Sequence, residues 1–188
     1  MDAKSIDLAG IKEILWHKMR GDLAFYVPYF KTNELLLCPA CLRPLDFDNF
    51  SLEHIIPQQA LADDPVEVRA AIPTSQRSGI TLLCRKRLLV NGKWLHNNGC
   101  NSWKGKYYDG ILRDMFRTDF KLNRYTERYT IGLFSAGYLA LFMKYGYQIA
   151  LSEAGRIMRQ QFFLPNRLLK ELPLGSQMVL KGEAPTHY

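Results

Sequence analysis

The stretch Cys38-Pro39-Ala40-Cys41 is a CxxC pair, and the two remaining cysteines of the chain are Cys84 and Cys100. Four cysteines are the number that a closed tetrahedral zinc site needs. A redox role for the CxxC pair would leave Cys84 and Cys100 unexplained, and the sequence lacks the βαβ context of thioredoxin-like folds. Four cysteines are also too few for a disulfide scaffold in 188 residues. We therefore predict a structural Zn²⁺ ion bound by Cys38, Cys41, Cys84 and Cys100.

Two segments within this cysteine frame carry side chains suited to phosphate chemistry. Ser51 to Ile56 suits a strand, as does Ile80 to Cys84, and the run Ser51-Leu-Glu53-His54-Ile-Ile-Pro57-Gln58 places an acid beside a histidine. Neighbours on a regular strand point to opposite faces, but at a strand end or bulge both can approach one phosphate. In Cys100-Asn101-Ser-Trp-Lys104, Asn101 and Lys104 share one face of a helix, since they are three residues apart. This spacing places an oxygen ligand and a cation near the helix start.

In combination these residues resemble the HNH nuclease family, also called the ββα-metal nucleases. The resemblance rests on Cys38-x-x-Cys41, Leu52-Glu53-His54-Ile55-Ile56-Pro57, Leu82-Leu83-Cys84 and Cys100-Asn101-x-x-Lys104, within residues 38–110. The run LEHIIPQQALADDP is also similar to the HNH module of RNA-guided CRISPR nucleases. The resemblance implies an α+β fold with a ββα-metal (HNH) core, in which a β-hairpin precedes a helix. It further implies structural zinc at the periphery and a catalytic divalent ion at the centre.

The resemblance also implies roles for individual residues. His54 matches the general base that takes a proton from the attacking water. Glu53 stands where the family has an acidic metal ligand, usually Asp, and Asn101 matches the helix residue that completes the site for Mg²⁺ or Mn²⁺. Lys104 matches a basic position near the phosphates. The implied reaction is hydrolysis of DNA phosphodiester bonds to 5′-phosphate and 3′-hydroxyl ends.

General chemistry agrees with these roles. An imidazole with an unperturbed pKa of about 6.5 is a competent base at neutral pH. A hard divalent ion held by carboxylate and amide oxygens would offset the negative charge that develops on the scissile phosphate.

One departure from the family pattern concerns the loop around the catalytic histidine. The family's central Asn falls on Gly79 in this chain. That Asn braces the loop, so we expect Thr81, Asn97 or Asn98 to take its place.

A second departure concerns the second zinc pair. The family commonly has another CxxC there, whereas Arg87 stands three residues after Cys84 and the partner is Cys100. We interpret residues 85–99 as an inserted hairpin, because Asn91-Gly92 between apolar runs favours a type I′ turn.

The charge balance points to a polyanionic partner. Lys and Arg exceed Asp and Glu to give a net charge of +7, with a pI near 9.3. Such a surplus attracts nucleic acid first and an anionic membrane surface second. We predict DNA as the partner, since no RNA-recognition motif supports RNA. The predicted nucleic-acid contacts are Arg85, Lys86, Arg87, Lys93, Lys104 and Lys106. For the inserted hairpin, a solvated basic loop remains an equal alternative.

The flanking segments have helical patterns. Apolar residues at helical spacing predict a helix over Ser5–Arg20, stopped by Gly21. Three further helices are predicted: one that starts at Asp64-Pro65, one that ends at Gly146 and one over Ser152–Phe162. We therefore expect three parts: an N-terminal helical segment (1–37) packed on the core, the nuclease core (38–110) and a helical C-terminal region (111–188).

The expected environment is cytoplasmic. The first fifteen residues have no basic segment followed by an apolar core, as a signal peptide would. The longest apolar run, Ile131–Met143, is shorter than the roughly 20 residues that span a bilayer.

Two functional hypotheses follow. The first is a metal-dependent HNH endonuclease of a restriction, defence or mobile-element system. The alternative is a catalytically weak, zinc-stabilised nucleic-acid-binding module, which the glycine at position 79 favours. One site makes one nick, so a double-strand break would require a homodimer or two successive events.

Overall fold

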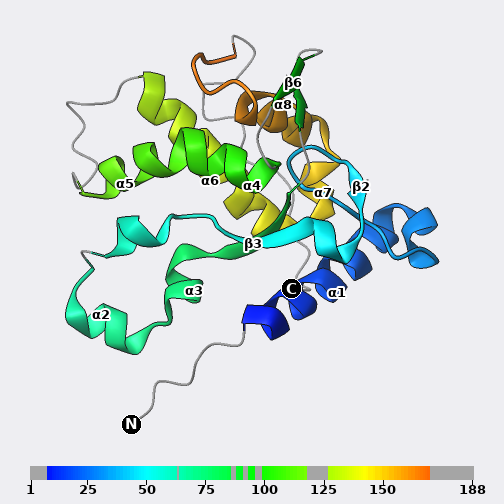
Figure 1. Ribbon diagram of the computed structural model, residues 1–188, viewed down its shortest axis with the longest axis horizontal. Coiled ribbons are helices and arrows are strands. Elements are labelled where there is room, and N and C mark those ends of the chain that lie inside the picture. Colours follow the sequence, from blue (N-terminus) through cyan, green and yellow to red (C-terminus); the bar gives the residue numbers. More distant parts are fainter. Residues whose placement is uncertain are drawn as a thin grey trace.

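The computed structural model describes residues 8–62, 64–85, 88–90, 93–95, 99–117 and 127–169, in a mostly helical α+β arrangement (Figure 1). The α-helices are α1 (Leu8–Tyr26), α2 (Val66–Ala71), α3 (Thr74–Ser78), α4 (Cys100–Lys104), α5 (Gly110–Arg117), α6 (Glu127–Tyr145), α7 (Tyr147–Ala150) and α8 (Glu153–Phe162). Shorter turns of helix are the 3₁₀ elements η1 (Pro28–Lys31), η2 (Phe47–Asn49) and η3 (Gln58–Leu61), and the π-helical η4 (Gly105–Asp109). The strands are β1 (Leu36–Leu37), β2 (Pro44–Leu45), β3 (Phe50–His54), β4 (Ile80–Cys84), β5 (Leu88–Val90) and β6 (Lys93–Leu95).

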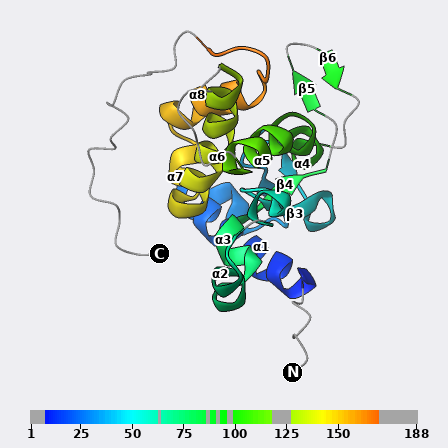
Figure 2. The same ribbon diagram turned by 90° about the vertical axis from the view of Figure 1, so that its left-hand side faces the viewer.

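The strands form small antiparallel pairs. Within the described ranges the sheets are β1–β2, β3–β4 and β5–β6. The expected strand Ile80–Cys84 is confirmed to the residue, and the expected strand at 51–56 lies at Phe50–His54. The pairing Leu88↔Leu95 confirms a hairpin at 88–95, and this hairpin projects from the body of the molecule (Figure 2).

The β3–β4 pair lies at the centre of the fold. Phe50 pairs with Cys84 and His54 with Ile80, so the two strands run alongside each other over their full lengths. Leu82, Leu83 and Cys84 are fully buried, because α1, α4 and α6 all pack against β4. The α4–η4–α5 helical run passes along β3 and η3 (Figure 1).

The N-terminal helix α1 is longer than the sequence pattern indicates. The predicted stop at Gly21 is wrong: the helix continues through it to Tyr26. It ends there because Pro28 disfavours helical geometry at the preceding residue, and Val27 is extended with φ −132° and ψ 90°. Burial of Leu23 in the shared core outweighs the modest helix cost of one glycine.

The other predicted helices agree with the structure more closely. The helix that starts after Asp64 begins at Val66, and Asp64 pairs with Arg77 instead of capping it. Gly146, at φ 57°, ends α6 as predicted, and the Ser152 hydroxyl caps α8 by accepting from the Gly155 amide at 3.0 Å.

The C-terminal helices and the central strands share one core. A single buried cluster contains Trp16 of α1, Phe50 of β3 and Phe162 of α8. The carbonyl of Phe162 accepts hydrogen bonds from Trp103 Nε1 at 2.9 Å and from the Tyr108 hydroxyl at 2.7 Å. Segments that the sequence divides into three parts therefore contribute to the same interior. None of the described helices is long and apolar enough to cross a bilayer.

A close approach between α5 and α6 yields a stability prediction. A Cβ at Gly132 would lie 2.7 Å from Ile111 Cγ2, whereas a Cβ at Gly137 of the same helix would meet nothing within 4 Å. Gly132→Ala should lower the free energy of unfolding by about 1–3 kcal/mol, as overpacking does. Gly137→Ala should raise it by about 0.5–1 kcal/mol through helix propensity. Urea unfolding followed by circular dichroism measures both, and equal effects of the two substitutions would contradict the predicted packing.

Candidate metal centre and active site

The four cysteine sulfurs converge from three separate segments. Cys38 and Cys41 lie in the turn between β1 and β2, Cys84 ends β4, and Cys100 begins α4. Their Sγ atoms all lie within 4.8 Å of one another, and no disulfide joins them. Cys84 Sγ is 3.6 Å from Cys41 Sγ and 3.5 Å from Cys100 Sγ. Tetrahedral sulfurs at the usual Zn–S distance of about 2.3 Å are about 3.8 Å apart, so the cluster is compatible with structural Zn²⁺.

The electrostatics of the cluster also suit a cation. Burial raises the pKa values of the Cys38 and Cys100 thiols. Hydrogen bonds from neighbouring thiols, Cys100 foremost, lower the pKa values of Cys41 and Cys84. Zinc requires all four as thiolates, which would leave a net charge of −2. Arg43 offsets part of that charge, since its Nε lies 3.3 Å from Cys41 Sγ and its Nη2 lies 3.7 Å from Cys84 Sγ.

Tyrosines from the C-terminal helices brace the CxxC turn. The Tyr138 hydroxyl of α6 donates to the Pro39 carbonyl at 2.5 Å, and the Tyr147 hydroxyl of α7 donates to the Leu37 carbonyl. Both acceptors flank Cys38. The position of the first zinc ligand is therefore set by helices more than 90 residues away in the chain.

His54 ends β3 and has hydrogen-bond partners at both ring nitrogens. Its Nδ1 is 2.7 Å from Ser78 Oγ, and its Nε2 is 2.8 Å from the Gln58 amide nitrogen. An amide nitrogen can only donate, so Nε2 accepts and the ring proton sits on Nδ1, which donates to Ser78. Burial, reinforced by the nearby Lys104 ammonium, lowers the pKa of His54 below its usual value. The imidazole is therefore neutral at neutral pH.

Glu53 belongs to a group of three charges, in which Glu53 and Lys104 are buried and Asp109 is partly exposed. The Lys104 ammonium lies 2.7 Å from Glu53 Oε1 and 2.6 Å from Asp109 Oδ1, and the lysine side chain is 0% exposed. Burial raises the pKa of Glu53 to about 7, although Lys104 opposes this effect. Lys104 and Asp109 also act electrostatically on His54. The acid and the histidine therefore share one electrostatic environment, as the end of a strand allows.

Asn101 joins α4 to β3. Its amide nitrogen donates to Ser51 Oγ at 2.8 Å and to the Leu52 carbonyl at 2.9 Å. Both acceptors precede Glu53 directly in the strand. The first turn of α4 is thus held against the strand end that carries Glu53 and His54.

The region around Gly79 shows why an asparagine is absent there. Gly79 has φ +63°, and a Cβ would lie 3.1 Å from Ile55 Cδ1, so a larger residue would be strained. Gly79 and Ser78 brace the loop through their backbone carbonyls, which accept from the Ile55 and Ile56 amides at 3.0 and 2.9 Å. Ser78 also holds the His54 ring, whereas Thr81, one of the expected substitutes, is the cross-strand partner of Glu53. Asn97 and Asn98 lie outside the described residues.

Sequence reasoning missed three residues of this site: Ser78, Gln58 and Asp109. Gln58 follows His54 by four residues. This spacing would have predicted the contact if a helical turn after Pro57 had been expected. Asp109 follows Lys104 by five residues, a spacing that brings side chains together only in a π-helical turn such as η4. Nothing in the local sequence links Ser78 to His54, 24 positions away.

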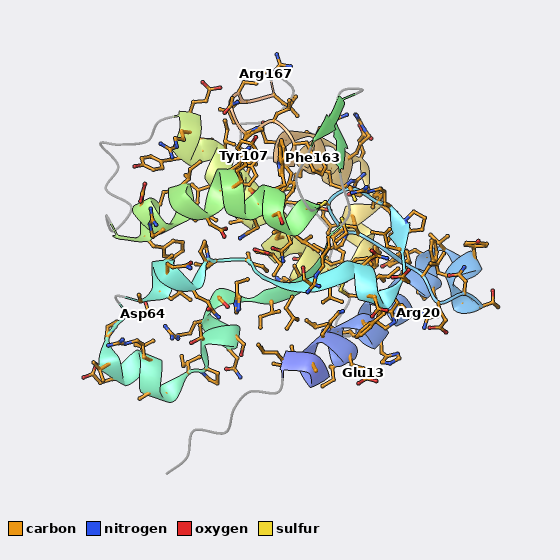
Figure 3. All side chains as sticks on the ribbon, in the orientation of Figure 1. Glu13, Arg20, Asp64, Tyr107, Phe163 and Arg167 are labelled. Atoms are coloured by element: carbon orange, nitrogen blue, oxygen red, sulfur yellow. The ribbon has the colours of Figure 1, made fainter. Side chains whose placement is uncertain are left out.

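The basic residues predicted to contact nucleic acid occupy different environments. Arg85 and Lys106 are exposed, whereas Lys104 is buried between carboxylates. Lys106, Tyr107 and Arg128 line a cavity of about 490 Å³ beside the C-terminal segment, where Tyr107 is labelled in Figure 3. Lys86 and Arg87 lie outside the described residues. Lys93 is described only as part of the β6 backbone.

Two residues of this region carry oxygen atoms of the kind that bind hard divalent cations. Glu53 offers a carboxylate and Asn101 an amide oxygen, the ligand types that Mg²⁺ and Mn²⁺ prefer. The Glu53 carboxylate already has a cationic partner, since the Lys104 ammonium lies 2.7 Å from its Oε1.

Comparisons with known proteins identify no relative. No protein-family profile, curated protein or solved structure matches this chain. What the described residues establish is therefore a buried four-cysteine cluster compatible with zinc at one end of the β3–β4 pair. His54 and the Glu53–Lys104–Asp109 ion triad lie toward the other end.

Zinc binding can be tested directly. Inductively coupled plasma mass spectrometry should find one zinc ion per chain in the purified protein. The Cys100→Ser variant should lose this ion because one of its four ligands is missing. Since structural zinc contributes about 10–16 kcal/mol in isolated fingers, the variant should also melt at a markedly lower temperature. Ser102→Ala, two residues along α4 at an exposed position, is the control and should keep its zinc. A wild-type chain without zinc that melts like Cys100→Ser would contradict the prediction.

Proposed function

We propose that the protein is a metal-dependent endonuclease of the HNH type that hydrolyses DNA phosphodiester bonds. The observation that carries the proposal is the placement of His54 and Glu53 at the end of β3, against the α4 helix that bears Asn101. The order of elements supports it as well, since the antiparallel β3–β4 pair precedes α4 and the cysteine cluster lies at the far end of β4.

His54 has the properties of a general base. It is neutral at neutral pH, and its Nε2 lone pair faces Gln58, an exposed residue whose amide a water molecule can replace. Nε2 would take the proton of that water as the oxygen attacks phosphorus. The Nδ1–H bond to Ser78 keeps the ring in the correct tautomer and stabilises the imidazolium that forms. Ser78 thus acts as a positioning residue.

Glu53 and Asn101 are the residues that would hold the catalytic divalent ion. When bound, a Mg²⁺ or Mn²⁺ ion would stabilise negative charge on the phosphate and the leaving oxygen. Asn101 contributes in a second way, because its amide nitrogen clamps the helix to the strand and so sets the separation between the two ligands.

The net charge of the chain favours DNA as the substrate. A charge of +7 attracts a polyanion at long range. Exposed Arg85 lies directly after β4, and exposed Lys106 lies two residues beyond Lys104 on the same helical run. Lys106 is suited to contact a phosphate near the scissile bond, whereas Arg85, at the cysteine end of the strand pair, is suited to contact the DNA backbone farther along.

A second candidate function is a zinc-stabilised nucleic-acid-binding module with weak catalysis. One observation favours it: the Glu53 carboxylate is buried and already paired with Lys104. A carboxylate engaged in this way binds an external cation less readily. Binding of DNA with no cleavage under any divalent ion would support this candidate over the nuclease.

The nuclease proposal predicts that His54→Ala loses cleavage of supercoiled plasmid in Mg²⁺ or Mn²⁺. Loss of a general base typically costs about 10²–10⁴-fold in rate. The matched control is His17→Ala, an exposed histidine on α1, which should cleave at the wild-type rate. Gel analysis of nicked and linear products reports the activity. Equal cleavage by His54→Ala and wild type would refute His54 as the base.

A further inference from the structure

We propose that Lys104 is a built-in counter-ion that competes with the catalytic divalent cation for Glu53, and that Asp109 is the positioning residue that holds Lys104 when the cation binds. This inference rests on the proposed function. It adds two residues with defined, opposite effects on metal affinity.

The burial of Lys104 carries the first step. Its side chain is fully buried, and its ammonium contacts Glu53 Oε1 at 2.7 Å and Asp109 Oδ1 at 2.6 Å. A buried ammonium has to keep a negative partner, because a lone charge without water is strongly disfavoured. The ammonium therefore occupies the location where the protein stabilises a positive charge beside Glu53.

Competition follows from this location. A divalent ion bound to the Glu53 carboxylate would lie within a few ångströms of the ammonium, and the two cations would repel each other at that distance in a poorly screened site. Binding of the ion therefore requires Lys104 to withdraw from Glu53. The Glu53 carboxylate is therefore paired with a cation before and after the exchange, first with Lys104 and then with the divalent ion.

Asp109 makes the exchange feasible. It already accepts from the ammonium at 2.6 Å, so Lys104 keeps one carboxylate partner after it leaves Glu53. The π-helical η4 segment is what places Asp109 there, since its i→i+5 register brings residue 109 onto the same face as residue 104. Asp109 is also about one-third exposed, with a side-chain exposure of 33%, which leaves room for the ammonium to move toward it.

A purely structural role for the triad makes a different prediction. If Lys104 only holds α4 against β3, removing either Lys104 or Asp109 would loosen the site and weaken metal binding in both cases. Competition instead predicts effects of opposite sign. Metal affinity measured without DNA therefore separates the two roles, and it does so without reference to cleavage.

The experiment is Mn²⁺ titration of zinc-loaded, DNA-free protein, with free Mn²⁺ measured by electron paramagnetic resonance. Lys104→Met should bind Mn²⁺ about tenfold more tightly or better, the effect of one charge-assisted hydrogen bond. Asp109→Asn should bind it more weakly than wild type, because Lys104 then has Glu53 as its remaining carboxylate partner within the triad. Lys106→Met, an exposed lysine two residues away, controls for loss of one positive charge and should change the affinity less than Lys104→Met does.

A double variant covers the case in which a single substitution fails to fold. Lys104→Met with Asp109→Asn removes one charge of each sign, keeps the net charge of +7 and should still bind Mn²⁺ more tightly than wild type. Circular dichroism melting verifies that each variant is folded. A folded Lys104→Met or double variant with wild-type or weaker affinity would overturn the inference, as would absence of Mn²⁺ binding in all forms. If either of these results is obtained and the wild-type protein still cleaves DNA, the inference about Lys104 fails but the proposed function does not.

Discussion

The convergence of four cysteine sulfurs is the constraint on which the rest of the structure depends. Cys84 lies 43 residues after Cys41 and 16 residues before Cys100, yet its sulfur is 3.6 Å from that of Cys41 and 3.5 Å from that of Cys100. A metal at this point would close two loops at once, so the chain between the ligands can vary in length at modest entropic cost. The segment between β3 and β4, which contains α2 and α3, and the projecting β5–β6 hairpin both lie between such ligands (Figure 2).

The candidate site inherits its geometry from the same constraint. Cys100 is the first residue of α4, so its attachment to the end of β4 fixes where that helix begins. Asn101 follows directly and Lys104 comes about one turn later, and the two side chains contact Leu52 and Glu53 of β3. The charged groups are thus positioned by sulfur atoms at the other end of the strand pair. This arrangement separates the cysteine cluster from the candidate site.

Local sequence signals predicted much of the fold. β4, the start of α4, the ends of α6 and α8 and the grouping of the cysteines were all predictable, because short apolar runs, capping residues and ligand spacing act over a few positions. The stop at Gly21 was not, since burial of the following turn outweighs the propensity of one residue.

The site was predictable only in part. The motif identified Glu53, His54, Asn101 and Lys104 as chemistry-bearing, and the structure places them together around the end of β3. It could not reveal that Lys104 is buried, that Asp109 is its second carboxylate partner, or that Ser78 contacts the His54 ring. Those contacts depend on how α3, which contains Ser78, and the π-helical η4, which contains Asp109, pack against β3. Tertiary contacts of this kind produce no periodic pattern in the sequence.

The two hydrogen bonds to the Phe162 carbonyl have a consequence for dissecting the protein. Trp103 and Tyr108, from the helical run that carries the site, both depend on this one backbone oxygen at the end of α8. A fragment cut out as residues 38–110 would leave an indole and a phenol without their acceptor and expose the aromatic surface behind them. Residues 38–110 therefore do not form an independent unit, and transferring them into a chimaera would require the C-terminal helices as well.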